Sequence, residues 1–430
     1  MTQLSSQAQI SRLIHRFGFG PKPGEFAKLM AGGLQSAQAS ILAVPTVDAG
    51  VANLATPTFA KIGSLVSKAA KFQDALQYYQ LVFWWLDRMV LSDNALPERM
   101  TWFWHGHWAT AISKVNYATP MLTQNQVLRQ NALGSFNTMA QSMINDCALQ
   151  YWLDGQQNYV AAPNENLSRE FMELFALGVG NYSQADVTSL AKSFTGYKLS
   201  AASLEAGVIT YTPKIHDTST VSILGNTGSF TPQDATAVLT AQKSCQDFIA
   251  QRLWFRFYNS SAPQPDKTLS DGFATRDIGA AVKALVYHPA LSDPLHAQAK
   301  SPVEWLVSAC RALSIQPSKL PTQSTVFSAL SRMGNTPFNP PNVGGWPPDE
   351  FWLGAAQAQE RINLSKYLVS NGDLSPISVL PAKQRVAAAA MWLGVAGWGA
   401  TTSQVLTSAA SDPARLAWLA LNAPEYVVNQ

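Results

Sequence analysis

The segment Pro163-Asn164-Glu165-Asn166-Leu167-Ser168-Arg169-Glu170-Phe171-Met172-Glu173-Leu174-Phe175-Ala176-Leu177-Gly178 has the pattern of a helix with one narrow charged face. At about 100° per residue, its polar residues share an arc of roughly 100°, and apolar side chains cover most of the rest. The arc contains Asn166, Arg169, Glu170 and Glu173. An asparagine suits the start of the helix and Gly178 suits its end. Such a face is either a solvated stripe or the wall of a polar pocket.

The composition is that of a folded protein with a large core. Hydrophobic residues make up 47% of the 430 residues, and charged residues make up 13%, about half the usual share. The net charge is +3 without a block of Lys or Arg, which argues against nucleic-acid binding. Three cysteines without CxxC spacing predict neither a disulfide framework nor a zinc-thiolate site. No uninterrupted apolar stretch is long enough to predict a transmembrane helix.

Helical periodicity dominates the chain, and the predicted fold class is mainly α: one large multi-helical domain over residues 1–430. A small β-hairpin is expected from residues 208–212 and 220–224. Long ordered loops are expected near 44–61, 200–230 and 334–352, where Pro, Gly and polar residues are frequent. The predicted helices span residues 6–16, 26–30, 72–91, 121–147, 164–177, 185–194, 234–258, 278–287, 302–313, 357–369 and 381–393.

Two histidines occur in the aromatic motif Trp102-Phe103-Trp104-His105-Gly106-His107-Trp108. On an extended segment both imidazoles point to one side, whereas on a helix they diverge by about 200°. A metal ion shared by His105 and His107 therefore requires Gly106 to break the preceding helix. The alternative is structural: one histidine is hydrogen-bonded within an aromatic core and the other lies at the helix end.

A third histidine, His216, precedes Asp217 in a predicted turn. A carboxylate beside an imidazole raises its pKa and can make it a proton-transfer group. The alternative is an Asx turn, in which Asp217 bonds the backbone two residues on. Asp154 and Asn158, in a turn before the charged helix, are expected either to reach the same pocket or to serve only their turn.

The loop 334–352 contains the run Pro341-Asn342-Val343-Gly344-Gly345-Trp346-Pro347-Pro348. Prolines stiffen a loop, and paired glycines permit a tight turn. Trp346 and Trp352 are flat apolar surfaces that suit sugar rings at the rim of a cleft, or that pack the loop onto the body.

The order of several motifs resembles the bacterial domain of unknown function 1800 family over nearly the full chain. The segments are 13–21, 103–107, 163–174, 195–197, 216–217 with 224–225, and 341–347. The resemblance implies a mainly α protein from a family that is often exported and has no settled activity. It also supports treating the polar motifs as one site. Relatives often have a lysine after the His-Asp pair, where this chain has Thr218 to Val221. Residues 1–6 show no signal-peptide pattern, so the compartment stays open.

The leading hypothesis is a hydrolase that cleaves a poly- or oligosaccharide by carboxylate acid/base catalysis. Its predicted catalytic residues are Glu170, Glu173, His105, His216 and Asp217. Its predicted substrate-binding residues are Arg169, Asn166, His107, Trp104, Trp346 and Asp154. One alternative is a metal-dependent hydrolase or oxidoreductase, with one divalent transition metal held by His105, His107 and His216. The other is a non-catalytic, surface-associated binding protein. The oligomeric state is left open.

Overall fold

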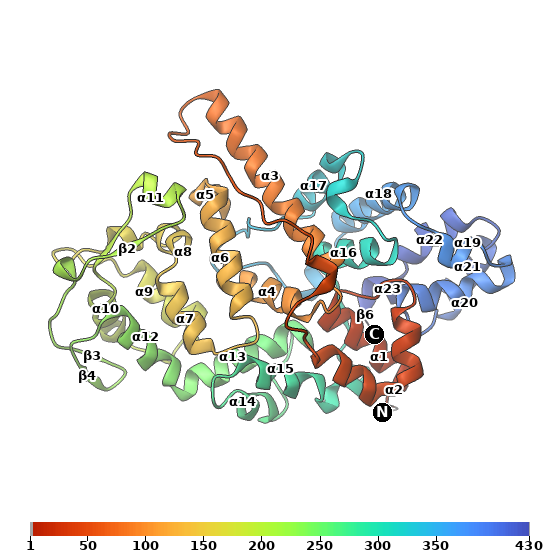
Figure 1. The fold of residues 1–430 in the computed structure, drawn as a ribbon. Helices are drawn as coiled ribbons and strands as arrows, with labels where there is room; N and C mark the ends of the chain where they lie inside the picture. The colour runs from red at the N-terminus through yellow and green to blue at the C-terminus, as the bar shows by residue number, and fades with distance from the viewer. Residues whose placement is uncertain (1–2, 430) are drawn as a thin grey trace.

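The protein is described over residues 3–429 by a computed structural model, in which helices form most of the chain (Figure 1). The expected mainly α fold is confirmed. The first half contains α1 (Ser6–Gly18), α2 (Glu25–Leu42), α3 (Lys68–Leu91), α4 (Leu96–His107), α5 (Ile112–Val115), α6 (Ala118–Gln130), α7 (Phe136–Ile144), α8 (Cys147–Trp152), α9 (Asn166–Glu170), the π-helical segment η3 (Phe171–Ala176), α10 (Gln184–Ser193) and α11 (Ala201–Glu205).

The second half is also mainly helical, and 3₁₀ turns occur between some of its helices. They are α12 (Pro232–Ala241), α13 (Lys243–Phe257), α14 (Thr268–Gly272), α15 (Ile278–Val286), α16 (Pro302–Ala312), α17 (Gln323–Arg332), α18 (Ala355–Asn371), α19 (Ser375–Ser378), α20 (Ala382–Leu393), α21 (Ala400–Ser408), α22 (Pro413–Leu421) and α23 (Pro424–Val427). The 3₁₀ turns of the described residues are η1 (Ala49–Val51), η2 (Gly155–Gln157), η4 (Pro213–Ile215), η5 (Pro289–Ser292), η6 (Pro317–Lys319) and η7 (Asp349–Leu353). In residues 3–429 no helix combines the length and the hydrophobicity needed to cross a bilayer.

Three two-stranded antiparallel pairs accompany the helices. They are β1 (Tyr197–Lys198) with β2 (Thr210–Tyr211), β3 (Val221–Ile223) with β4 (Asn226–Gly228), and β5 (Gln298–Ala299) with β6 (Val428–Asn429). The predicted pairing of 208–212 with 220–224 is wrong. Leu224 and Gly225 both have positive φ, 51° and 82°, and so form a tight two-residue turn that pairs β3 with the next residues instead.

Two predicted helices are each divided in the structure. The segment 121–147 breaks after Gln130 because Ser135 caps a new helix, accepting from the Thr138 N–H at 3.4 Å. The segment 234–258 breaks at Gln242, whose extended backbone (ψ 145°) both ends α12 and precedes α13. The apolar periodicity continues across both breaks, so the sequence pattern did not reveal them.

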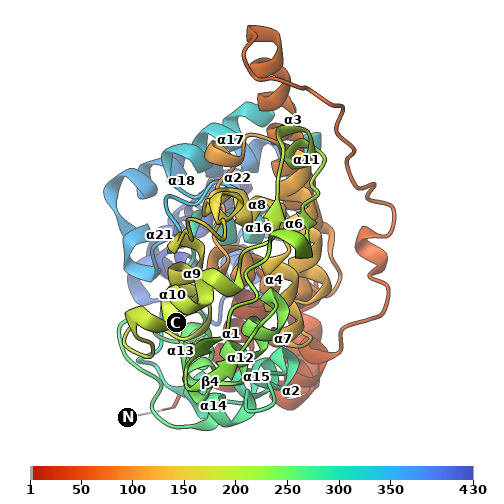
Figure 2. The same cartoon turned by 90° about the vertical axis from the view of Figure 1, so that its left-hand side faces the viewer.

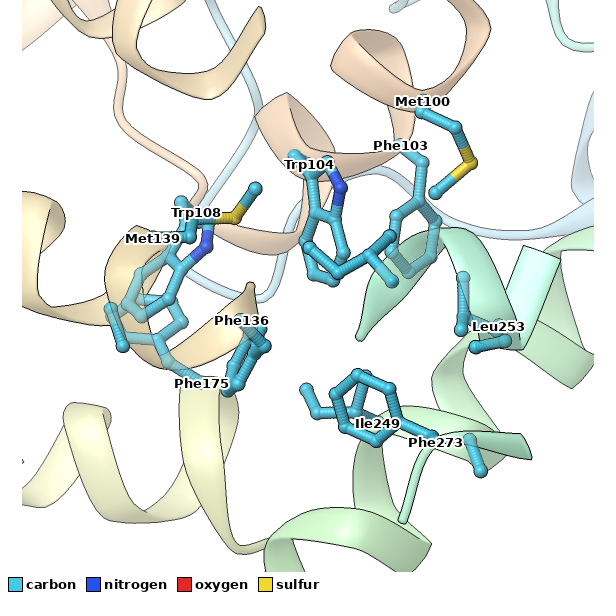
Figure 3. Close-up of a cluster of buried hydrophobic side chains, with 14 of the residues drawn as sticks. Met100, Phe103, Trp104, Trp108, Phe136, Met139, Phe175, Ile249, Leu253 and Phe273 are labelled. Atoms are coloured by element: carbon cyan, nitrogen blue, oxygen red, sulfur yellow. The ribbon is translucent and has the colours of Figure 1, made fainter. Parts of the chain in front are cut away.

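Helix α4 lies at the centre of the molecule, between the C-terminal helices α18–α22 on one side and α7–α12 on the other (Figure 1). Its side chains enter two buried clusters: Met100 and Trp104 belong to one, and Trp102 to the other. Figure 3 shows Phe103 and Trp104 facing Leu253 of α13 across the first cluster. The helix that carries both histidines of the aromatic motif is therefore held on several sides.

An ion cluster inside this packing ties α4 to α3 and α6. The Glu98 carboxylate accepts from the Arg129 Nε at 2.6 Å, from the Arg88 Nε at 2.8 Å and from the Trp85 Nε1 at 3.0 Å. Burial alone would raise the pKa of Glu98, but the charges and hydrogen bonds of Arg129 and Arg88 lower it to about 2.

This cluster predicts acid sensitivity. Because the folded pKa of Glu98 is below its unfolded value, its stabilisation is present above about pH 4.5 and is lost as the pH falls toward about 2. We expect Glu98→Gln to lower the free energy of unfolding at neutral pH by about 3–5 kcal/mol, since two guanidiniums lose their counter-charge. Urea denaturation across this pH range measures both effects.

The matched control is Glu360→Gln, which removes the carboxylate of the surface pair with Arg332. Its cost should be about 1 kcal/mol or less. Equal losses in the two variants would contradict the structural role of Glu98.

Candidate functional site

The charged helix is built from α9 followed by the π-helical segment η3. The Glu173 carboxylate accepts from the Tyr182 hydroxyl at 2.6 Å. The Arg169 guanidinium pairs with Glu165 at 3.0 Å and with the Gln184 side chain at 2.8 Å. Burial, and next the charge of Glu173, raise the pKa of Glu170. These side chains are half-buried, so the helix has a partly solvated polar face.

The π-helical segment connects this helix to the aromatic motif. The Leu177 and Gly178 N–H groups both donate to the Met172 carbonyl, at 2.8 and 3.2 Å. The His107 Nε2 lies 2.9 Å from the Phe175 carbonyl oxygen and donates to it. Single π-helical turns are frequent at functional sites. Here the widened turn contacts one of the predicted site residues through its backbone.

His105 and His107 do not meet. Helix α4 continues through Gly106 to His107, so the break that a shared metal ion requires does not occur. The His105 Nε2 accepts from the Phe338 N–H at 3.0 Å, in a pocket of aromatic rings that includes Trp85 and Trp346. Burial lowers the pKa of His105 to about 3. It is a neutral, hydrogen-bonded core histidine.

His216 is held by backbone on both sides. Its Nδ1 lies 3.1 Å from the Thr195 carbonyl oxygen and its Nε2 lies 3.1 Å from the Phe230 carbonyl oxygen. Asp217 accepts from the Ser219 N–H at 2.8 Å, which is the Asx turn of the structural alternative. Within residues 3–429, no three His, Cys, Asp or Glu side chains gather closely enough to hold a metal ion. The donor geometry thus gives no support to the metal hypothesis.

Other predicted contact residues have structural partners. Trp104 is fully buried and donates from its Nε1 to the Ala132 carbonyl at 3.0 Å. Asp154 pairs with Lys114 at 2.8 Å in its turn, and Asn166 donates to the Leu153 carbonyl at 3.0 Å. Trp352 is fully buried. Each of these side chains is therefore buried or bonded within the protein.

The structure does place two predicted residues, His107 and Trp346, in one cavity of about 120 Å³. It lies between α4, α13 and the loop that precedes η7. Aromatic rings and aliphatic groups form its walls, and the polar lining comes from His107, Arg252, Arg256 and Ser260. Neither Glu170 nor Glu173 lines this cavity. The full lining is Trp102, Phe103, Gly106, His107, Arg252, Phe255, Arg256, Ser260, Trp346 and Pro348.

The two arginines of the cavity differ in their partners. Arg256 donates to the Glu304 carboxylate at 2.8 Å. Within residues 3–429, Arg252 forms no ion pair, and its buried Nε has no hydrogen-bond partner. Burial, followed by the positive charge of Arg256, lowers the pKa of Arg252. The cavity therefore contains a guanidinium that no carboxylate neutralises.

His107 is oriented at the edge of this cavity by its bond to Phe175. Because Nε2 donates to that carbonyl, the Nδ1 of the neutral ring carries a lone pair, and Nδ1 has no partner. Burial, and then the charge of Arg252, lower the pKa of His107 to about 3. It is a neutral hydrogen-bond acceptor at physiological pH.

Trp346 reaches the cavity because of the glycine pair before it. Gly345 has a φ of +85°, and a Cβ at this position would lie 2.2 Å from the Gly106 carbonyl oxygen. The loop therefore approaches the end of α4 closely, and the Trp346 ring stacks on Trp102 with 4.8 Å between centroids.

Arg252 and Arg256 are functional candidates that the sequence analysis missed. They are four residues apart on one face of α13. The local signal was present, since no acidic residue lies between Asp247 and Asp266. Glu304 neutralises Arg256. The fold brings these two residues together, so the sequence alone does not predict the pair.

Comparison with protein families identifies the class. A family model described as a protein of unknown function (DUF1800) matches residues 12–428. The chain belongs to the DUF1800 family, as its motifs indicated. Comparisons with curated proteins and with solved structures gave no match.

The burial of the two histidines predicts that neither titrates in the physiological range. Because both pKa values are about 3, the imidazole resonances should keep the shifts of the neutral ring between about pH 5 and about pH 8. NMR of protein labelled at histidine measures this, with His105→Gln and His107→Gln to assign the signals. A midpoint near 6.5 for either ring would contradict the buried, neutral assignment.

Proposed function

We propose that the cavity between α4 and α13 binds a compact organic anion with an apolar body. The observation that carries this proposal is Arg252, whose guanidinium lies in an apolar-walled cavity without a counter-charge. Arg252 is half-buried, with its Nε fully buried; a partly desolvated charge without a counter-charge is costly, and a bound carboxylate or phosphate would remove much of that cost. Arginine suits this role because its planar fork matches the two oxygens of such a group.

The walls and the size of the cavity support a small ligand. Trp346, stacked on Trp102, and Phe255 offer flat apolar surfaces. A volume of about 120 Å³ is somewhat smaller than the roughly 150 Å³ of a cavity that accommodates benzene. The cavity is thus suited to a ring or a short branched chain, and a longer ligand would have only one end inside.

His107 would supply a directional contact. Its neutral ring has an Nδ1 lone pair that is buried without a partner, and a ligand N–H or O–H would bond it by displacing the side chains that cover it, while Nε2 remains bonded to Phe175. Charge on Arg252 and an acceptor on His107 together suit a hydroxy acid or an amide-bearing acid.

Benzoate is a simple probe of this proposal, and benzamide is its neutral isostere. We expect calorimetry to show that benzoate binds and that benzamide binds much more weakly. Arg252→Gln should weaken benzoate binding by about thirtyfold or more, because it removes one partner of a buried charge pair.

The matched control is Arg332→Gln, which changes an arginine at the surface and should leave the affinity unaltered. Equal affinity for benzoate and benzamide would overturn the proposal, as would an unchanged affinity in Arg252→Gln.

A second candidate function is the carboxylate-catalysed hydrolysis of a poly- or oligosaccharide at the charged helix. The observation in its favour is that burial and the neighbouring Glu173 raise the pKa of Glu170. A raised pKa suits a general acid, and Glu173 with the Tyr182 hydroxyl at 2.6 Å suits the base or nucleophile. This site would be separate from the cavity, and Arg169 would contact the substrate from the same face.

This second proposal predicts loss of hydrolysis in Glu170→Gln. With the general acid removed, turnover on any glycan that the wild-type protein cleaves should fall by about a hundredfold or more. Reducing-sugar release from a glycan panel is the measurement, and Glu350→Gln, an exposed glutamate, is the control. Full activity in Glu170→Gln would exclude the mechanism.

A further inference from the structure

An arm projects from the body of the protein at the start of α3. Figures 1 and 2 show from two directions that the first turns of α3, and the extended chain leading to them, stand clear of the other helices. The buried part of α3 becomes continuous at Leu81. The ten residues from Lys68 to Gln77 therefore extend about 15 Å at 1.5 Å per residue.

The base of the arm is anchored by specific contacts. The Ile62 and Gly63 N–H groups donate to the Glu205 carboxylate of α11, the latter at 2.8 Å. The Tyr117 hydroxyl donates to the Gly63 carbonyl at 3.0 Å, and the Gln77 amide to the Ala60 carbonyl at 2.8 Å. These contacts hold the base of the arm against the body of the protein and so fix the direction in which the arm projects.

The tip combines exposed apolar and basic side chains. Val66 is 84% exposed, Phe72 65% and Leu76 40%. Phe72 and Leu76 are one turn apart on the same face of α3, and Lys68 precedes them by one turn on that face. Lys71 is exposed next to Phe72 in the sequence, and Lys61 is exposed at the base of the arm, between Ala60 and Ile62. Asp74 is the one carboxylate within residues 61–76. A single exposed apolar residue is common on a protein surface. This arm instead combines three exposed apolar residues with three lysines.

We propose that this arm docks the protein onto an anionic lipid surface. Its charge complements acidic headgroups, and an interfacial segment buries its apolar side chains about 5–10 Å deep, within the reach of a 15 Å projection. Lysine clusters are typical of membrane-surface contacts, whereas lysine is depleted in protein–protein interfaces. The tip is convex, so it suits a flat, deformable surface better than a small ligand.

Vesicle flotation of the full chain tests the proposal. We expect binding to vesicles of phosphatidylcholine with phosphatidylglycerol, little binding to phosphatidylcholine alone, and weaker binding at high salt. The variant Lys61→Gln/Lys68→Gln/Lys71→Gln should lower the partition coefficient about fivefold per lysine. The variant Val66→Ser/Phe72→Ser should lower it by about tenfold or more, since it removes the inserted apolar area.

The matched controls use exposed residues elsewhere on the protein. Lys267→Gln/Lys283→Gln/Lys383→Gln removes the same charge, and Val179→Ser/Val379→Ser removes two valines that are each 77% exposed. Both should bind the acidic vesicles more strongly than the corresponding arm variants. Circular dichroism shows whether each variant is folded.

Three results would overturn the proposal. One is equal binding to acidic and neutral vesicles, or none to either. The second is equal loss in arm and control variants. The third is self-association of the lipid-free protein that the arm variants abolish, which would make the arm a contact between copies of the chain. Because the arm is separate from the cavity, Arg252→Gln should not change vesicle binding, and failure of either proposal leaves the other standing.

Discussion

The architecture around the cavity depends on one shared carboxylate, that of Glu304. It lies in the first turn of α16, where it accepts from Arg99 of α4 at 3.0 Å and from Arg256 of α13 at 2.8 Å. Burial alone would raise the pKa of Glu304, but Arg256 and Arg99 lower it, and the Ser301 N–H donates to it as well. Three helices are therefore fixed to each other by one buried anion whose loss would leave two guanidiniums without a counter-charge.

The same arrangement explains why Arg252 is electrostatically distinct. Glu304 of α16 pairs with Arg99 and Arg256, whereas Arg252, one helical turn before Arg256 on α13, forms no ion pair with it. Arg252 is thus a positive charge placed by the fold, beside a second positive group that raises its cost. Native proteins seldom retain such a group unless a partner compensates it. The cavity wall, with its aromatic rings, is the surface on which that partner would lie.

The periodicity of the chain was sufficient to predict a mainly α fold, because amphipathic helices are a local property. The same periodicity did not locate the breaks between helices or the ion pairs between distant residues. Gln242 ends one helix and starts another without any change of apolar period. The ion partner of Arg256 is Glu304, which is distant in sequence, so no local rule distinguishes Arg256 from Arg252. Trp346 could be singled out from the sequence because it follows a pair of glycines, which permits a tight turn. In the structure it lines the cavity, and Gly345 has a positive φ.

The charged helix and the cavity are connected through His107, which lines the cavity and is bonded to the last turn of the helix. Phe171 and Phe175 are buried, while Glu170 and Glu173 are half-buried on the opposite side. The backbone of the π-helical turn faces inward, where the Phe175 carbonyl fixes His107. Phe175 lies in the last turn of the helix, where carbonyls have no intrahelical partner, so its carbonyl is available to accept from His107. The last turn of this helix therefore orients the imidazole of His107, while its carboxylates lie on the opposite face, and this contact connects the charged motif of the sequence to the cavity.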